Sequence, residues 1–160
     1  MKSFVNARFL LMSFMALSLM AAPAFAEYIF EAEMTGDQEI VPSGSTAYGM
    51  ATVIMNDAMT QIAYTVNFAG LDAPQTGAGF FIGANNEEGT EVLSLPVEVP
   101  LAGIWEITPE IAEALLDEGF YINIFSDMEM FPHGEIRGNF TNTMVQDEAS
   151  SLDQVKALYR

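Results

Sequence analysis

Apolar and polar residues alternate with a period of two along several short stretches, which is the pattern of half-buried β-strands. Residues 28–34 place Tyr, Phe, Ala and Met on one face and two Glu on the other. Residues 61–68 alternate in the same way, and together with residues 47–56 they predict a hairpin across the turn at 56–60. Gly49 interrupts the first strand of this hairpin, which predicts a bulge or a close neighbour there.

Further strands are predicted where short apolar runs are bounded by Gly, Pro, Asn or Asp. They lie at residues 77–83, 91–95 and 103–107, and residues 119–140 hold two more strands joined by a tight connection that contains Pro132. About eight short strands with turn residues between them predict an all-β fold. We expect an antiparallel β-sandwich or a partly closed Greek-key barrel, with one short helix before the last hairpin.

The expected helix begins after Thr108, a residue type that caps helix N-termini. Pro109 suits the first helical position because that residue needs no hydrogen-bonded amide. Ile111 and Leu115 lie one turn apart and predict the buried side of the helix. Gly119 is placed to end it.

The first 26 residues have the features of a secretory leader. Lys2 and Arg8 supply the positive charge, residues 9–21 form an apolar run, and Ala24 and Ala26 form a small-x-small cleavage site. The apolar run is shorter than the ~20 residues that a spanning helix needs. We therefore expect a periplasmic or secreted protein with no membrane span after cleavage.

Removal of Lys2 and Arg8 with the leader changes the formal net charge from −17 to −19. Arg137, Lys156 and Arg160 then face 22 acidic residues. This charge repels nucleic acids and anionic membrane surfaces, so neither is an expected partner. Because the chain has no cysteine, it has no disulfide framework.

The expected organisation is a leader at 1–26, one domain at 27–141, and a polar tail or short helix at 142–160. Four motifs in this domain are similar to those of the CHRD family, named after its copies in chordin. The motifs are Gly-Asp-Gln-Glu-Ile-Val-Pro at 36–42, Trp-Glu-Ile-Thr-Pro at 105–109, Gly-Phe-Tyr-Ile-Asn-Ile at 119–124 and Gly-Glu-Ile-Arg-Gly at 134–138. The resemblance covers residues 28–141. It implies an extracytoplasmic all-β domain and suggests binding rather than catalysis.

Three residues depart from the family pattern, which has a His-x-His pair on one strand and a third histidine on another. Phe80, Ile82 and Phe125 occupy these positions here and offer no nitrogen donor to a metal. The resemblance therefore predicts a dry apolar cluster of the three side chains in place of a metal site. No cofactor is expected.

Arg137 is the only basic side chain between residues 27 and 141. Glu135 lies two positions earlier and projects from the same strand face. We predict a structural ion pair of Arg137 with Glu39 or Glu135; the alternative is that Arg137 anchors a ligand carboxylate. His133 is the single histidine and lies in a turn-like connection, so a nucleophilic triad is not expected.

These observations predict a non-enzymatic binding or structural module that acts on an unidentified extracytoplasmic protein or ligand. Two alternatives remain open. The first is a metal-binding protein that uses acidic oxygen ligands for a calcium-like ion, with candidate loops at 37–39, 85–88 and 127–129. None of these loops has the spacing of a known calcium loop. The second is a polymer hydrolase that uses two carboxylates.

Overall fold

Residues 28–143, the part of the chain that the computed structural model describes, form nine strands, one 3-10 helix and one α-helix. The strands are β1 (Tyr28–Thr35), β2 (Tyr48–Met55), β3 (Gln61–Ala69), β4 (Gly77–Ile82), β5 (Thr90–Leu95), β6 (Leu101–Glu106), β7 (Phe120–Phe125), β8 (Ile136–Asn139) and β9 (Thr141–Asn142). The 3-10 helix η1 (Gly36–Gln38) follows β1, and the α-helix α1 (Pro109–Leu116) precedes β7. The predicted leader and the predicted tail from residue 144 onward lie outside the described residues.

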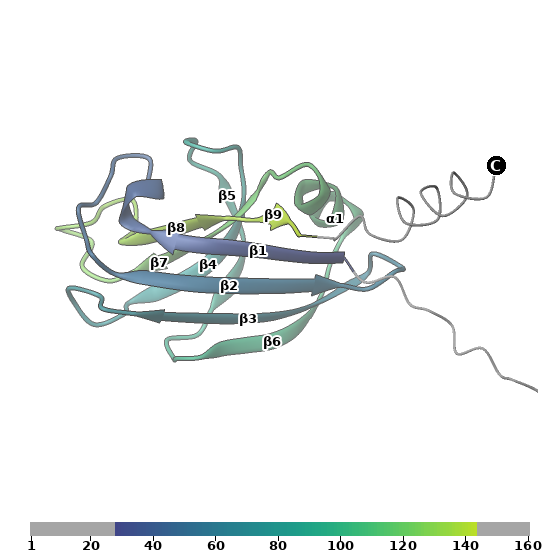
Figure 1. Cartoon of the computed structure of the whole chain (residues 1–160), viewed down its shortest axis with the longest axis horizontal. Helices are drawn as coiled ribbons and strands as arrows, with labels where there is room; N and C mark the ends of the chain where they lie inside the picture. Colours follow the sequence, from purple (N-terminus) through teal and green to yellow (C-terminus); the bar gives the residue numbers. More distant parts are fainter. Residues whose placement is uncertain (1–27, 144–160) are drawn as a thin grey trace, which may run out of the picture.

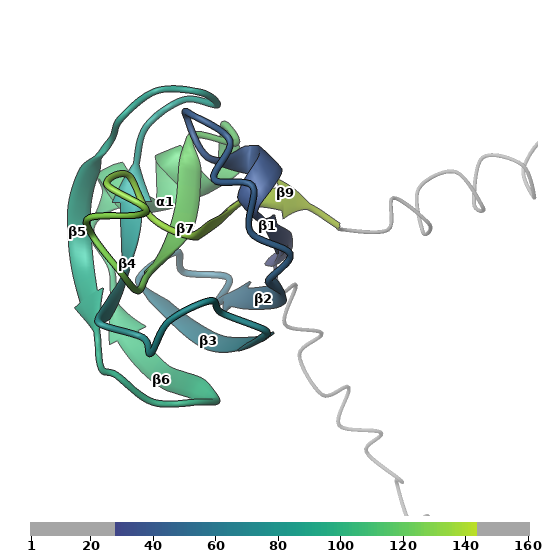
Figure 2. The same cartoon turned by 90° about the vertical axis from the view of Figure 1, so that its left-hand side faces the viewer.

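The strands form a nearly closed antiparallel barrel, which confirms the predicted fold class. Their order is β5-β4-β7-β8-β1-β2-β3-β6, so β5 and β6 are the two edges. Figure 2 shows this ring, with β5 and β6 on its left side. The short strand β9 continues the path of β8 along β1, where Asn142 pairs with Phe30. The pairing therefore reaches past residue 141, where we expected the domain to end.

The predicted alternation in the first hairpin explains how the barrel fills its interior. Phe30, Ala32 and Met34 of β1 are buried, whereas Glu31 and Glu33 are exposed. Ile62 and Val66 of β3 lie in the same core. Because each strand turns alternate side chains inward, one wall supplies apolar atoms to the core and polar atoms to the surface.

Gly49 has a close neighbour rather than a bulge. The pairing of β2 with β1 and β3 continues through this residue without a shift, opposite Met34 and Phe68. A side chain at position 49 would collide with the terminal methyl of Met34 and lie 2.7 Å from the carbonyl oxygen of Asn67. A glycine is needed here because the neighbouring strands leave no room for a Cβ.

Helix α1 begins and ends where the sequence indicates, but its caps differ in detail. Thr108 is the N-cap residue with extended backbone, yet its side chain makes no capping hydrogen bond. At the other end the left-handed residue is Glu118, with φ of 58°, and the amide of Gly119 donates to the carbonyl of Ala114. Ile111, Ala112 and Leu115 form the buried side. No helix among residues 28–143 has the length and apolar character needed to cross a bilayer.

The two ends of the barrel differ, as Figure 1 shows: α1 and the turn between β2 and β3 lie at one end, and several loops lie at the other. The loop end carries the segment after β1, the connection from β3 to β4, and the connection from β7 to β8. This last connection runs from Ser126 to Glu135 and contains two turns, so it is longer than the tight connection that we predicted. Its length allows it to reach the other loops at this end.

Candidate functional site

The three polar residues selected from the sequence lie together at the loop end. Glu39 follows η1, while Glu135 and Arg137 lie at the start of β8. All three are buried, with exposed fractions of 2%, 0% and 1%. Strand β8 pairs with β7 on one side and β1 on the other, and loops cover its outward-facing residues. The barrel therefore has a polar cluster outside its apolar core.

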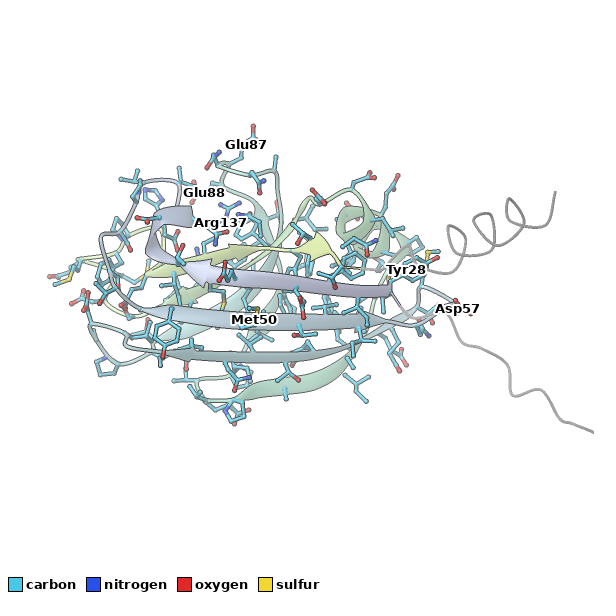
Figure 3. All side chains as sticks on the ribbon, in the orientation of Figure 1. Tyr28, Met50, Asp57, Glu87, Glu88 and Arg137 are labelled. Carbon is cyan, nitrogen blue, oxygen red and sulfur yellow. The ribbon has the colours of Figure 1, made fainter. Side chains whose placement is uncertain are left out.

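The guanidinium of Arg137 is held by carbonyl groups rather than by a carboxylate. Its two terminal nitrogens donate to the backbone oxygens of Glu87 at 2.9 Å and Ala84 at 3.0 Å. It also donates to the side-chain oxygen of Asn139, and its central carbon lies 3.5 Å from the centre of the Tyr121 ring. Figure 3 shows Arg137 below the loop that carries Glu87.

The predicted ion pair of Arg137 is therefore wrong. In the described part of the chain, its hydrogen bonds go to carbonyl and amide oxygens, and Glu39 acts on it only through longer-range attraction. Burial lowers the pKa of Arg137, while Tyr121 and Glu39 oppose this shift. The physical reason is that loop carbonyls fill the positions around the guanidinium. These contacts use four of the five N–H groups of Arg137, and the side chain is buried, which disfavours the alternative that it anchors a ligand carboxylate.

Glu135 connects three loops through its carboxylate. One oxygen accepts hydrogen bonds from the Ser45 hydroxyl and the Asp72 amide, both at 2.7 Å. The other accepts a hydrogen bond from the hydroxyl of Ser126. The backbone oxygen of Glu135 accepts a further one from Ser43 at 2.8 Å. The carboxylate of Glu135 therefore accepts three hydrogen bonds from within the protein and joins the loops at this end of the barrel.

Glu39 and Asn123 face each other in the same cluster. The amide nitrogen of Asn123 donates to the backbone oxygen of His133 at 2.7 Å and to one carboxylate oxygen of Glu39 at 3.4 Å. Among the described residues, the second carboxylate oxygen of Glu39 and the side-chain oxygen of Asn123 have no hydrogen-bond partner. Burial raises the pKa of Glu39 to about 7, against the opposing effects of Asn123 and Arg137. Glu39 therefore gains and loses its proton near neutral pH.

Two of the three loops considered for calcium are organised by other contacts. The carbonyls of Ala84 and Glu87 bind Arg137, and one carboxylate oxygen of Asp127 accepts the amides of Glu129 and Met130. Within residues 28–143, no three His, Cys, Asp or Glu side chains are grouped so that they could hold a metal ion. At the loop of residues 85–88, the guanidinium of Arg137 takes the place that a cation would have beside the carbonyl oxygens of Ala84 and Glu87.

Two depressions at the loop end bear on the hydrolase alternative. His133 lines one of about 180 Å³, which has no acidic residue in its lining. Asp127 and Glu129 line the other, of about 550 Å³. One oxygen of Asp127 already accepts hydrogen bonds from the backbone amides of Glu129 and Met130, so one acid of this pair stabilises its own turn. Neither depression includes the buried acids Glu39 and Glu135.

Phe80 and Ile82 share the inner face of the barrel wall, as predicted, but the predicted cluster of three is wrong because Phe125 lies on the opposite face. Phe80 is buried in the core, where its ring centre lies 5.3 Å from that of Tyr64. Pairing of Phe80 with Ile122 sends the even-numbered residues of β7 inward and the odd-numbered ones outward. Phe125 therefore lies outside, so our placement of the third family histidine there does not hold.

A row of stacked side chains runs along the outside of this wall. Phe125 contacts the ring of Phe81 at 6.1 Å between ring centres, and Phe81 stacks on Tyr121 at 5.0 Å. The guanidinium of Arg137 lies over the ring of Tyr121. The hydroxyl of Tyr121 accepts a hydrogen bond from the amide of Gly89, and this bond holds the loop between β4 and β5. Phe125 is thus the first ring of a row that ends at Arg137.

Sequence reasoning missed a surface groove on the outer face of β1, β2 and β3. It has a volume of about 420 Å³, and Tyr48 and Met50 on its border are 66% and 45% exposed. Figure 3 shows Met50 on the face formed by these strands. We call this hollow the outer groove; its lining residues are Glu33, Met34, Thr35, Tyr48, Gly49, Met50, Asn67, Phe68 and Ala69. Apolar residues on both faces of β2 are the sequence signal that could have revealed it.

Comparison with known proteins identifies one family. A sequence model described as the CHRD domain matches residues 30–140. No curated protein and no solved structure matches the chain. The match spans the barrel from β1 to the residue before β9, and includes the polar cluster and the outer groove.

Proposed function

Because the chain belongs to the CHRD domain family, we propose that it is an exported, non-enzymatic module that binds a basic protein segment with apolar side chains. The outer groove is the binding surface in this proposal. The observation that carries it is the pair Tyr48 and Met50, two large apolar side chains left exposed beside a hollow in an acidic face. Exposed apolar side chains that border a hollow are typical of recognition surfaces.

The buried polar residues support binding rather than catalysis. The carboxylate of Glu135 and the guanidinium of Arg137 are engaged with the protein's own loops. A general acid or base must reach the proton that it transfers, within about 3 Å. Glu135 is fully buried and directed at loop residues, so its place in the barrel suits a structural role.

The charge around the outer groove favours a basic partner. Glu33 lines the groove, and Glu31 is exposed on the same face of β1. The groove has no basic side chain in its lining, and the mature chain as a whole is strongly acidic. Such a field speeds the approach of cationic segments and disfavours anionic ones. The apolar border then selects those cationic segments that also carry aliphatic or aromatic side chains.

Fluorescence anisotropy with labelled peptides tests this function. One peptide alternates lysine with leucine, and a second of equal charge alternates lysine with serine. We expect the mature protein to bind the leucine peptide at least about fivefold more tightly at about 150 mM salt, where surface electrostatics are screened. Tyr48→Ala and Met50→Ala should each weaken this binding about fivefold or more, or about 1 kcal/mol.

Ile104→Ala is the matched control, since Ile104 is 72% exposed on β6 and lies outside the outer groove. It should leave peptide binding unchanged. If the serine peptide bound as tightly as the leucine peptide, net charge alone would explain the binding. A loss in Ile104→Ala as large as that in Tyr48→Ala would place binding elsewhere on the barrel, and either result contradicts the proposal.

A further inference from the structure

The described chain ends beside the face that carries the outer groove. Strand β9 pairs with β1, placing Thr141 opposite Glu31. The amide of Thr143 then donates to the backbone oxygen of Ile29 at 2.9 Å. The described chain therefore ends next to β1, at the end of this strand opposite to the groove-lining residues Glu33 to Thr35.

The sequence beyond this point includes a stretch that fits the groove chemically. Residues 154–160 read Gln-Val-Lys-Ala-Leu-Tyr-Arg. They contain Lys156 and Arg160, no acidic residue, and the apolar side chains of Val155, Leu158 and Tyr159. After loss of the leader, Lys156, Arg160 and Arg137 are the basic residues of the sequence, and Arg137 is buried. This stretch has the composition that the proposed function requires of a partner.

Residues 154–160 are also within reach. A strand rises ~3.3 Å per residue, so the path along β1 from Ile29 to Glu33 is about 13 Å. The ten residues from 144 to 153 can span up to about 33 Å when extended. A tethered segment of this kind has an effective concentration in the millimolar range, so even a weak contact fills its site.

We propose that residues 154–160 occupy the outer groove of their own chain and that a partner must displace them. Lys156 then lies near Glu31 and Glu33, and the apolar side chains contact Tyr48 and Met50. This inference rests on the proposed function for its regulatory meaning, because the tail covers the same surface that a basic partner would use. The charge of the face, the exposed border and the place where the chain leaves β1 all support this occupant over an acidic or wholly apolar one.

Carbodiimide cross-linking tests the placement directly, since Lys156 is the only lysine left after removal of the leader. Carbodiimide joins a side-chain amine to a carboxylate with no spacer, and mass spectrometry of the digested full chain identifies the acid. We expect Lys156 to link to Glu31 and Glu33 in monomeric protein. Links spread over acids on other faces, such as Glu110 of α1 and Asp57, would overturn the inference.

A variant of the full chain provides the control. In Val155→Ser/Leu158→Ser, the links from Lys156 to Glu31 and Glu33 should fall at least about fivefold. The link to Asp153, three residues away in sequence, should persist and shows that the chemistry still works. Unchanged links to Glu31 and Glu33 in this variant would mean that charge alone brings Lys156 to these acids. This result would contradict the proposal that residues 154–160 bind in the outer groove.

Two further measurements separate the possible failures. In a mixture of unlabelled and ¹⁵N-labelled protein, links between chains of different mass would show that a second copy fills the groove, and would overturn the intramolecular proposal. The Val155→Ser/Leu158→Ser variant should bind the lysine–leucine peptide at least about tenfold more tightly than the unaltered chain. Equal binding by both proteins overturns the inference about the tail alone. No binding by either protein overturns the proposed function, and the cross-linking result then tests the placement of residues 154–160 independently.

Discussion

Arg137 lies with its guanidinium carbon 3.5 Å from the centre of the Tyr121 ring, while its nitrogens hold the loop that follows β4. One arginine thus joins a strand, an aromatic side chain and a loop outside the apolar core. A buried guanidinium needs hydrogen-bond acceptors, and two backbone carbonyls and the side-chain oxygen of Asn139 accept four hydrogen bonds from it here, without a carboxylate.

Arg137→Met should destabilise the protein by about 2–4 kcal/mol, because the carbonyls of Ala84 and Glu87 lose their donors and the cation–π contact is lost. Urea unfolding measures this loss. Arg137→Lys should recover only part of it, since an ammonium cannot bridge both carbonyls as the planar guanidinium does. A loss below about half a kcal/mol for Arg137→Met would contradict the role of Arg137 in holding the loop.

Glu135→Gln should lower the free energy of unfolding by about 2–3 kcal/mol. The carboxylate accepts from Ser45, Asp72 and Ser126, and a glutamine amide replaces one acceptor oxygen with a donor that faces donors. Urea unfolding again measures the effect. Glu129→Gln, in an exposed part of the same connection, is the matched control and should be near neutral. Equal effects of the two variants would show that Glu135 does not fix the loop end.

The buried acid Glu39 predicts a pH dependence of stability. Its pKa is raised from 4.5 to about 7 in the folded protein, chiefly by burial. Below pH 4.5 the carboxyl is protonated in both the folded and unfolded states. As the pH rises toward 7, the unfolded chain loses this proton first, so the contribution of Glu39 to stability falls and is lost as the pH passes the folded-state pKa.

Glu39→Gln should remove this dependence. Relative to the variant, the unaltered protein should lose about 3 kcal/mol of stability between pH 4.5 and pH 7.5, measured by urea unfolding at a series of pH values. Asp37→Asn, an exposed acid in η1, is the control and should give a curve parallel to that of the unaltered protein. Parallel curves for Glu39→Gln and the unaltered protein would contradict the raised pKa.

Phe80→Ala and Phe125→Ala test the assignment of the two rings to opposite faces. Phe80 is 0% exposed and is surrounded by core rings, so its truncation should cost about 3–5 kcal/mol. Phe125 lies half-buried on the outside against Phe81, and its truncation should cost about 1 kcal/mol. Unfolding in urea measures both. Similar costs would mean that both rings share the core.

The local elements of this protein follow from its amino-acid sequence. Alternation predicts β1 and the hairpin of β2 and β3 because a strand presents its side chains with a period of two, whatever it later pairs with. Pro109 marks the start of α1 because its fixed φ is a local property that suits the first helical turn, although the side chain of Thr108 before it makes no capping hydrogen bond. The motifs around residues 36–42 and 134–138 indicated the family, which the match over residues 30–140 confirms.

Which of these residues contact one another depends on the way the strands pair and the loops fold. Phe80 and Phe125 are separated by the wall because the pairing of Phe80 with Ile122 sets the parity of β7, and a shift of one residue would have reversed it. Arg137 binds Ala84 and Glu87 instead of an acid because the loop after β4 folds over β8. The outer groove depends on three aligned strands around Gly49. Register and loop placement are long-range properties, so a period read along one strand cannot supply them.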